Sequence, residues 1–152
     1  MNSNRLFERG NEEKVNCLIN YFRRVSHTIP RGLVTFTRRF VTPFALPDWR
    51  NSQRRVRNLR VLSQGTIEDD GGGMLQVDFA NAYVGGGVLS HGCVQEEIRF
   101  AICPELIASM LFTERLGDTE VTKYKIKNLT RAQPEPLKIK CIFFTGFLSK
   151  WT

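Results

Sequence analysis

The feature that most constrains this chain is a strand, a run of three glycines and a helix in close succession. Residues 74–79 alternate apolar and polar side chains, which predicts a strand whose buried face consists of Leu75, Val77 and Phe79. Residues 85–87 are all glycine, so their backbone N–H groups can approach a ligand closely. A triple glycine by itself is more often a flexible turn, so its meaning depends on the helix that follows.

That helix is predicted to begin near Val94 and to end at residue 103, because Pro104 disfavours helical geometry in the residue before it. A helix N-terminus behind a glycine loop favours an anion such as a diphosphate. Pro104 then suits the first turn of a second helix. The apolar stripe of this second helix consists of Leu106, Ile107, Met110 and Leu111.

Two adjacent acids, Glu96 and Glu97, lie in the first turn of the predicted helix. On a helix, adjacent side chains point about 100° apart, so these two carboxylates cannot flank one bond as the usual glycosidase pair does. If both act, one transfers protons while the other holds substrate. The alternative is that they only complement the positive end of the helix dipole, which is common at helix starts.

The remaining predicted elements are short. Helical spacing of apolar residues predicts an amphipathic helix over residues 11–24, with a stripe made of Val15, Leu18, Ile19 and Phe22. Strands are predicted over three upstream segments, residues 33–37, 56–62 and 64–68. Residues 42–55 are predicted to form a loop, and residues 69–73 a turn. After residue 121 only residues 139–144 resemble a strand.

The net charge of +7 is distributed unevenly along the chain. Residues 31–60 carry eight arginines and one acid, Asp48, whereas residues 61–120 carry ten acids and two basic residues. Residues 121–152 are basic again, with seven basic residues and one acid. The basic blocks could bind an anionic polymer or could be solvated surface. Only Trp49 accompanies the arginines of residues 50–60, so direct DNA binding is the least favoured function.

The cysteines Cys17, Cys93, Cys103 and Cys141 are widely spaced, without a nearby histidine cluster, so no metal site and no cofactor is predicted. No apolar run approaches the roughly 18–20 residues that a membrane span needs. The first residues are polar and charged, unlike a secretory signal. We therefore expect an intracellular protein of the nucleus or the cytoplasm, with no membrane partner.

Residues 76–107 read QVDFANAYVGGGVLSHGCVQEEIRFAICPELI, and this string resembles the catalytic signature of poly(ADP-ribose) glycohydrolases. That signature is a triple glycine, a short variable spacer, here residues 88–94, and then Gln-Glu-Glu. Residues 21–24, 32–38 and 65–68 also resemble the family, so the resemblance covers about residues 12–120. It implies an α/β fold, specifically a macrodomain-like three-layer α/β/α architecture that is incomplete here. It also implies a glycosidase that hydrolyses the ribose–ribose O-glycosidic bond of poly(ADP-ribose).

The same resemblance implies roles for individual residues. Glu97 would be the general acid and base, Glu96 would hold ribose hydroxyls, and Asp78 would order the loop. The residues implied in substrate binding are Asn81, Gly85, Gly86, Gly87 and Gln95. A general acid needs a raised pKa whereas a helix N-terminus lowers it, so desolvation or a neighbouring charge would have to dominate. Neither His91 nor Cys93 in the variable spacer is expected to be catalytic.

The resemblance fades near residue 120, where the charge also changes sign. We therefore expect residues 1–120 to be the N-terminal part of the catalytic region and residues 121–152 to be a divergent basic tail, which makes the chain a truncated product. Its partners would be poly(ADP-ribose), ADP-ribose and poly(ADP-ribosyl)ated proteins, as in a DNA damage response. Two alternatives remain open: an active enzyme, and an inactive fragment with an ADP-ribose-binding or regulatory role. Because the site is expected to be truncated, we predict that the chain hydrolyses poly(ADP-ribose) weakly.

Overall fold

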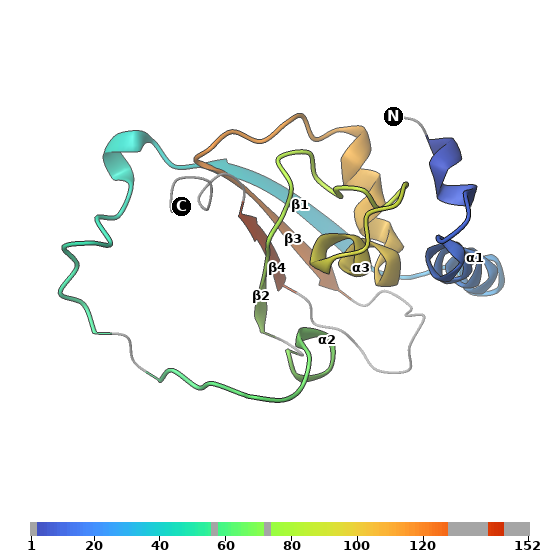
Figure 1. Cartoon of the computed structure of the whole chain (residues 1–152), viewed down its shortest axis with the longest axis horizontal. Coiled ribbons are helices and arrows are strands. Elements are labelled where there is room, and N and C mark those ends of the chain that lie inside the picture. The colour runs from blue at the N-terminus through green and yellow to red at the C-terminus, as the bar shows by residue number, and fades with distance from the viewer. Residues whose placement is uncertain (1–2, 56–57, 72–73, 128–139, 145–152) are drawn as a thin grey trace.

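A computed structural model describes residues 3–55, 58–71, 74–127 and 140–144 of the chain (Figure 1). The described elements, in chain order, are η1 (Ser3–Phe7), α1 (Glu12–His27), β1 (Leu33–Phe40), η2 (Pro43–Ala45), α2 (Ile67–Asp70), β2 (Leu75–Asp78), α3 (Gln95–Ile102), η3 (Pro104–Leu111), β3 (Glu120–Lys127) and β4 (Lys140–Phe144). None of the helices in these described segments is long and apolar enough to cross a membrane.

The strands form one mixed sheet in the order β1-β3-β4-β2. β3 is antiparallel to both β1 and β4, with Tyr124 opposite Phe36, and β2 runs parallel to β4. The α3 and η3 helices lie beside this sheet, and α1 lies beyond them (Figure 1). The described part of the chain is therefore a sheet with helices beside it, which confirms the predicted α/β class.

The core fills the space between β3 and the two helices α3 and η3. Phe100 of α3, Leu106 of η3 and Tyr124 of β3 are fully buried, and Val84 and Val88 of the glycine loop pack into the same cluster. The ring of Tyr124 meets the rings of Phe36 and Phe100 edge to face. The glycine loop is thus attached to the core through its own apolar side chains.

β3 corrects the prediction that residues 139–144 are the only strand after residue 121. Thr122, Tyr124 and Ile126 point into the core, while Lys123 lies exposed on the other side. The alternation was present in the sequence, but lysines at the outward positions give the segment the composition of a basic tail. The predicted strand over residues 139–144 is confirmed as β4, whereas residues 128–138 lie outside the described segments.

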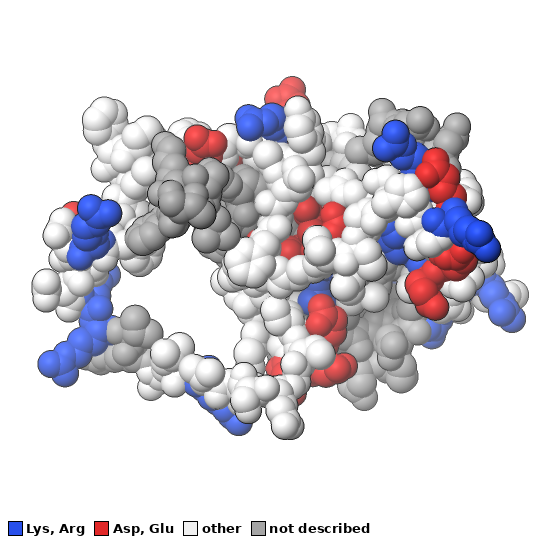
Figure 2. Space-filling model, viewed as in Figure 1, with Lys and Arg blue, Asp and Glu red and all other residues white. Residues whose placement is uncertain are grey.

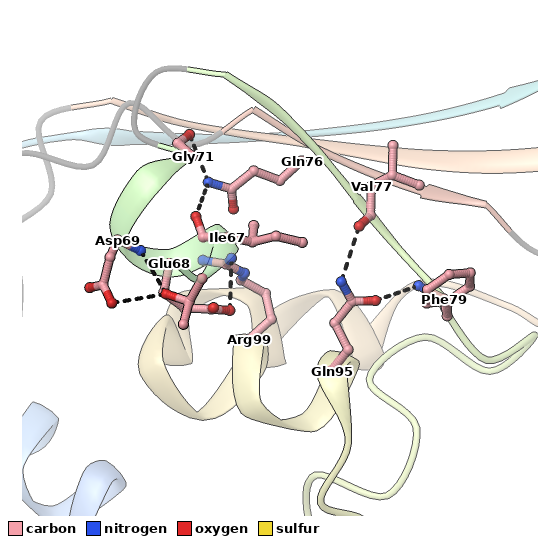
Figure 3. Close-up of polar contacts among 10 residues, drawn as sticks. Ile67, Glu68, Asp69, Gly71, Gln76, Val77, Phe79, Gln95 and Arg99 are labelled. Carbon is pink, nitrogen blue, oxygen red and sulfur yellow. Dashed lines mark hydrogen bonds and ion pairs between the residues drawn. The ribbon is translucent and has the colours of Figure 1, made fainter. Parts of the chain in front are cut away.

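β2 confirms the predicted strand but reverses its buried face. Gln76 and Asp78 are buried, whereas Leu75, Val77 and Phe79 are exposed. Gln76 points inward because polar partners lie there: its amide donates to the backbone oxygens of Ile67 and Gly71 (Figure 3). Burial of Gln76 therefore follows the hydrogen bonds of its amide group rather than hydrophobicity.

Upstream of β2 the predictions had mixed outcomes. The amphipathic helix is confirmed as α1, and the strand over residues 33–37 is confirmed as the longer β1. The predicted loop over residues 42–55 is confirmed apart from the single turn η2. The predicted strands over residues 56–62 and 64–68 are wrong for the described residues: residues 58–62 form no strand, and Thr66 caps the short α2 instead.

Truncating Tyr124 tests whether β3 is an integral part of the fold. We expect Tyr124→Ala to lower the free energy of unfolding by about 3–5 kcal/mol, because it leaves a cavity at the centre of the core. Tyr124→Phe should cost about 1 kcal/mol, since Ser109 loses the hydroxyl at 3.2 Å but keeps its bond to the Leu106 carbonyl. Urea unfolding measures both, with the exposed Tyr83→Ala as the control. Equal losses in Tyr124→Ala and Tyr83→Ala would show that β3 is not part of the core.

Candidate active site

The candidate site is the loop between β2 and α3, residues 79–94, together with the first turn of α3 (Figure 1). The loop reverses through successive tight turns, in which the Gly86 amide donates to the Tyr83 carbonyl and the Val88 amide to the Gly85 carbonyl. Gly85 and Gly86 have φ values of +87° and +49°. Residues with a β-carbon rarely adopt positive φ values, so the turns require glycine at these positions.

Glu96 holds the first half of this loop. One of its carboxylate oxygens accepts from the Asn81 amide at 2.8 Å and the other from the Gly85 amide at 2.7 Å. The side chain is only 2% exposed. Burial raises the pKa of the Glu96 carboxyl to about 7, although the two backbone hydrogen bonds act in the opposite direction. Desolvation therefore outweighs the factors that lower a carboxyl pKa at this helix start.

Glu97 holds the second half of the loop in the same way. Its Oε1 accepts from the Gly87 amide at 2.8 Å, and its Oε2 accepts from the Val94 amide at 2.9 Å. The second bond joins the side chain to the backbone at the start of its own helix, where amides have no helical partner. Each of the four carboxylate oxygens of Glu96 and Glu97 thus accepts one backbone amide.

Gly86 lies between the two carboxylates. A β-carbon at this position would come within 2.2 Å of Glu97 Oε1 and 3.0 Å of Glu96 Oε2. The two acids therefore converge on one glycine, although adjacent residues of a helix point apart. Gly92 also packs against Glu97, since a β-carbon at Gly92 would lie 2.8 Å from Glu97 Oε1.

Asp78 lies at the end of β2, where the candidate loop begins. Its carboxylate is buried, and neither oxygen has a hydrogen-bond partner among the described residues. Burial raises the pKa of Asp78 to about 6, while the positive charge of Arg99 opposes this rise. Arg99 is itself buried on α3 and forms an ion pair with Glu68 of α2 at 3.2 Å (Figure 3). Asp78 is thus a desolvated acid near Glu97, and the negative charge of Glu97 also raises the pKa of Asp78.

Gln95 and Asn81 lie beside the acids and contact the backbone. The Gln95 amide accepts from the Phe79 amide at 3.0 Å and donates to the Val77 carbonyl at 3.2 Å, which joins α3 to the end of β2 (Figure 3). The side chain of Asn81 accepts from the Tyr83 amide and lies exposed on the loop. The structure therefore brings the predicted residues together around one loop, and their roles toward a substrate stay predictions.

Two residues of this region had no role in the sequence interpretation. Gly92 packs against Glu97, and the buried Lys14 of α1 donates to the backbone oxygens of Ser90 and Gly92. Lys14 is the third residue of α1 and follows two glutamates, so the sequence around it gives no indication that its side chain is buried. For Gly92 the available signal was that it is the single glycine of the variable spacer, residues 88–94.

The surface charge follows the distribution in the sequence. Acidic side chains gather near the middle of the face in Figure 2, over the region of α2 and the candidate loop, whereas basic side chains gather over the long loop that follows β1 (Figure 2). Among the described residues no group of three or more His, Cys, Asp or Glu side chains could hold a metal ion. The polar groups that the described part of the chain does bring together at the site are carboxyl groups and backbone amides.

The buried Asp78 predicts an unusual pH dependence of stability. A raised folded-state pKa means that the folded protein binds this proton more tightly, so its contribution to stability is lost as the pH rises from about 4 through about 6. Asp78→Asn removes the buried charge and should stabilise the fold by about 1–3 kcal/mol at pH 8, with little effect at pH 4. Urea unfolding at both pH values measures this, with the exposed Asp118→Asn as control. If Asp78→Asn were less stable than the wild type at pH 8, the carboxylate would not be desolvated in the way that the structure indicates.

Comparison with known proteins assigns this arrangement to a family. The family model described as poly(ADP-ribose) glycohydrolase, macro domain fold, matches residues 46–131, and the model for the helical domain of the same enzymes matches residues 1–38. The first match includes the whole candidate site and continues through β3. The second match includes α1.

Individual relatives carry the same name. Poly(ADP-ribose) glycohydrolase 1 of Arabidopsis thaliana is 47% identical over 117 residues, which cover 75% of this chain and 21% of that protein. Poly(ADP-ribose) glycohydrolase 1 of Caenorhabditis elegans is 40% identical over 111 residues, which cover 71% of this chain and 14% of that protein. The chain thus spans about a fifth or less of the length of these relatives. With the family model matching most of its residues, the chain belongs to the poly(ADP-ribose) glycohydrolase family.

Proposed function

We propose that this chain is a glycosidase that hydrolyses the ribose–ribose O-glycosidic bond of poly(ADP-ribose). The observation that supports this most is the convergence of two buried carboxylates, Glu96 and Glu97, on Gly86. Glycosidic bond cleavage needs a carboxyl group that protonates the leaving oxygen and then, as carboxylate, activates water. The glycine turns beside these acids have positive φ values and carry no side chains, so a ribose and its diphosphate could approach their backbone closely.

The two acids are proposed to have different roles. Glu97 donates its proton to the departing ribose oxygen and afterwards accepts a proton from the attacking water, so its protonation state is restored in each cycle. Glu96 accepts hydrogen bonds from ribose hydroxyls and keeps the first half of the loop in place. Asp78, which is buried at the end of β2, orders the loop that begins there. Nuclear or cytoplasmic location and poly(ADP-ribosyl)ated protein partners belong to the same proposal.

A second candidate function, binding of ADP-ribose without turnover, is favoured by one specific observation. All four carboxylate oxygens of Glu96 and Glu97 accept backbone amides, and a protonated Glu97 would lose one of these bonds. Substrate binding would have to displace the Gly87 or Val94 amide before a proton can be donated. A chain that does not make this exchange would hold the ligand and leave it intact.

The experiment that separates the two functions uses the purified 152-residue chain. Isothermal titration with ADP-ribose measures binding, and release of ADP-ribose from poly(ADP-ribose) measures turnover. Binding together with release supports the glycosidase, and binding without release supports the second function. A chain that is folded but shows neither would contradict both.

A further inference from the structure

A part of the chain far from the glycine loop in sequence holds that loop in place. Three side chains of residues 8–14 reach the spacer residues 90–92. Glu8 pairs with His91 at 2.7 Å, and the Asn11 amide lies 3.5 Å from the other ring nitrogen of His91. The Lys14 ammonium donates to the carbonyl oxygens of both Ser90 and Gly92, the second at 2.8 Å.

These contacts differ in their energetic weight. Glu8 and His91 are both about half exposed, and exposed ion pairs contribute little to stability. Lys14 is 7% exposed, so its charge has been removed from water to make the two hydrogen bonds. Hydrogen bonds from a charged donor are roughly twice as strong as neutral ones. A buried ammonium is costly unless hydrogen bonds compensate for its lost hydration. The two hydrogen bonds of Lys14 therefore contribute most of the energy that joins residues 8–14 to the spacer.

From Lys14 a continuous set of contacts leads to Glu97. The Gly92 amide donates to the Gly87 carbonyl at 3.2 Å, and the Gly87 amide donates to Glu97 Oε1 at 2.8 Å. Gly92 is also packed so closely that a β-carbon would lie 2.8 Å from both Glu97 Oε1 and the α-carbon of Gly87. Two residues later, the Val94 amide donates to the other oxygen of Glu97.

The first half of the loop is held differently. Its amides, those of Asn81 and Gly85, donate to Glu96 rather than to any group of residues 90–92. The loop therefore has two anchors, Glu96 for its beginning and Lys14 together with Glu97 for its end. Lys14 lies in the segment that matches the helical domain, whereas the loop lies in the segment that matches the macro domain fold.

We propose that Lys14 is a positioning residue for Glu97: it fixes Gly92 and Ser90, and through them the amides that orient the Glu97 carboxylate. The catalytic meaning of this contact rests on the proposed function, but the positioning itself does not. The helical segment thereby contributes to the site a residue that touches neither the acids nor the first half of the loop.

Residue-resolved amide hydrogen exchange tests this directly in the full chain. Lys14→Met keeps the apolar stem and removes both donors, so protection of the Gly87 and Val94 amides should fall at least about tenfold. The Asn81 and Gly85 amides should stay within about twofold of the wild type. Lys123→Met, an exposed lysine on β3, is the matched control and should change none of the four. Unchanged protection at Gly87 and Val94, or an equal loss at all four amides, would overturn the proposal.

A milder variant and a kinetic measurement complete the test. Should Lys14→Met not fold, Lys14→Gln retains one donor group and should give a smaller loss that is still confined to Gly87 and Val94. In a poly(ADP-ribose) release assay, Lys14→Met should lower kcat at least tenfold and change KM less than threefold. A wild-type chain without turnover would contradict the proposed glycosidase, whereas the exchange pattern would still decide the role of Lys14.

Discussion

Glu97→Gln should lower the release of ADP-ribose from poly(ADP-ribose) by at least about 10²-fold, because glutamine cannot donate or accept the proton of the reaction. The structure adds a second effect. A glutamine amide offers one acceptor oxygen and one donor nitrogen, so its nitrogen would face the Gly87 or the Val94 amide, both of which are donors. We therefore expect a loss of about 1–3 kcal/mol in the free energy of unfolding as well.

Two comparisons separate these effects. Glu96→Gln creates the same mismatch against Asn81 or Gly85, so it should destabilise the fold similarly and mainly weaken substrate binding. Glu114→Gln, on an exposed side chain, should change neither property. Turnover is measured as ADP-ribose release and stability by urea unfolding. Near-normal turnover in Glu97→Gln would remove Glu97 from the proposed mechanism, whatever its effect on stability.

Gly86→Ala should destabilise the protein by about 3 kcal/mol or more and weaken ADP-ribose binding at least tenfold. The substitution combines two costs: a φ of +49° that is unfavourable for alanine, and a β-carbon 2.2 Å from Glu97 Oε1. Relief of the contact requires Glu97 to leave the Gly87 amide, which disrupts the loop at the acid. Gly86→Val should be more severe, because its branched side chain is larger and stiffer.

The chain offers a matched control for the backbone cost. Gly10 also has a positive φ, +95°, but a β-carbon there would have no atom within 4 Å. Gly10→Ala should therefore cost only about 1–2 kcal/mol and leave ADP-ribose binding unchanged. Unfolding and titration calorimetry are compared for both variants. Equal stability and equal affinity in the two would mean that the loop at Gly86 is a turn without a role in the site.

The local elements around the site could be predicted because their determinants are local. Helical spacing identified α1, and Pro104 marked the boundary between α3 and η3. Alternation identified β2, and the glycines marked the loop between β2 and α3. The signature string also placed Glu96 and Glu97 at a helix start beside that loop. Each of these conclusions depends on residues that are close in sequence.

The errors at β2 and β3 occur where contacts with distant segments decide the structure. The alternating residues of β3 were present, but only its pairing with β1 and β4 and its contact with Phe100 make Tyr124 a core residue. β2 turns its polar side inward because α2 offers carbonyl oxygens to Gln76. A pattern of apolar and polar residues cannot tell which face of a strand will find hydrogen-bond partners.

The sequence by itself determined the family, the α/β class and the two glutamates at the start of α3, since each follows from a contiguous string of residues. Only the tertiary structure decided that each carboxylate oxygen accepts an amide of the loop, that Asp78 is desolvated, and that Lys14 holds Gly92. The reason is that burial and hydrogen bonding depend on which segments meet in space. Lys14 and Gly92 lie far apart in sequence, and no local pattern indicates that a lysine of α1 leaves water to bind that loop.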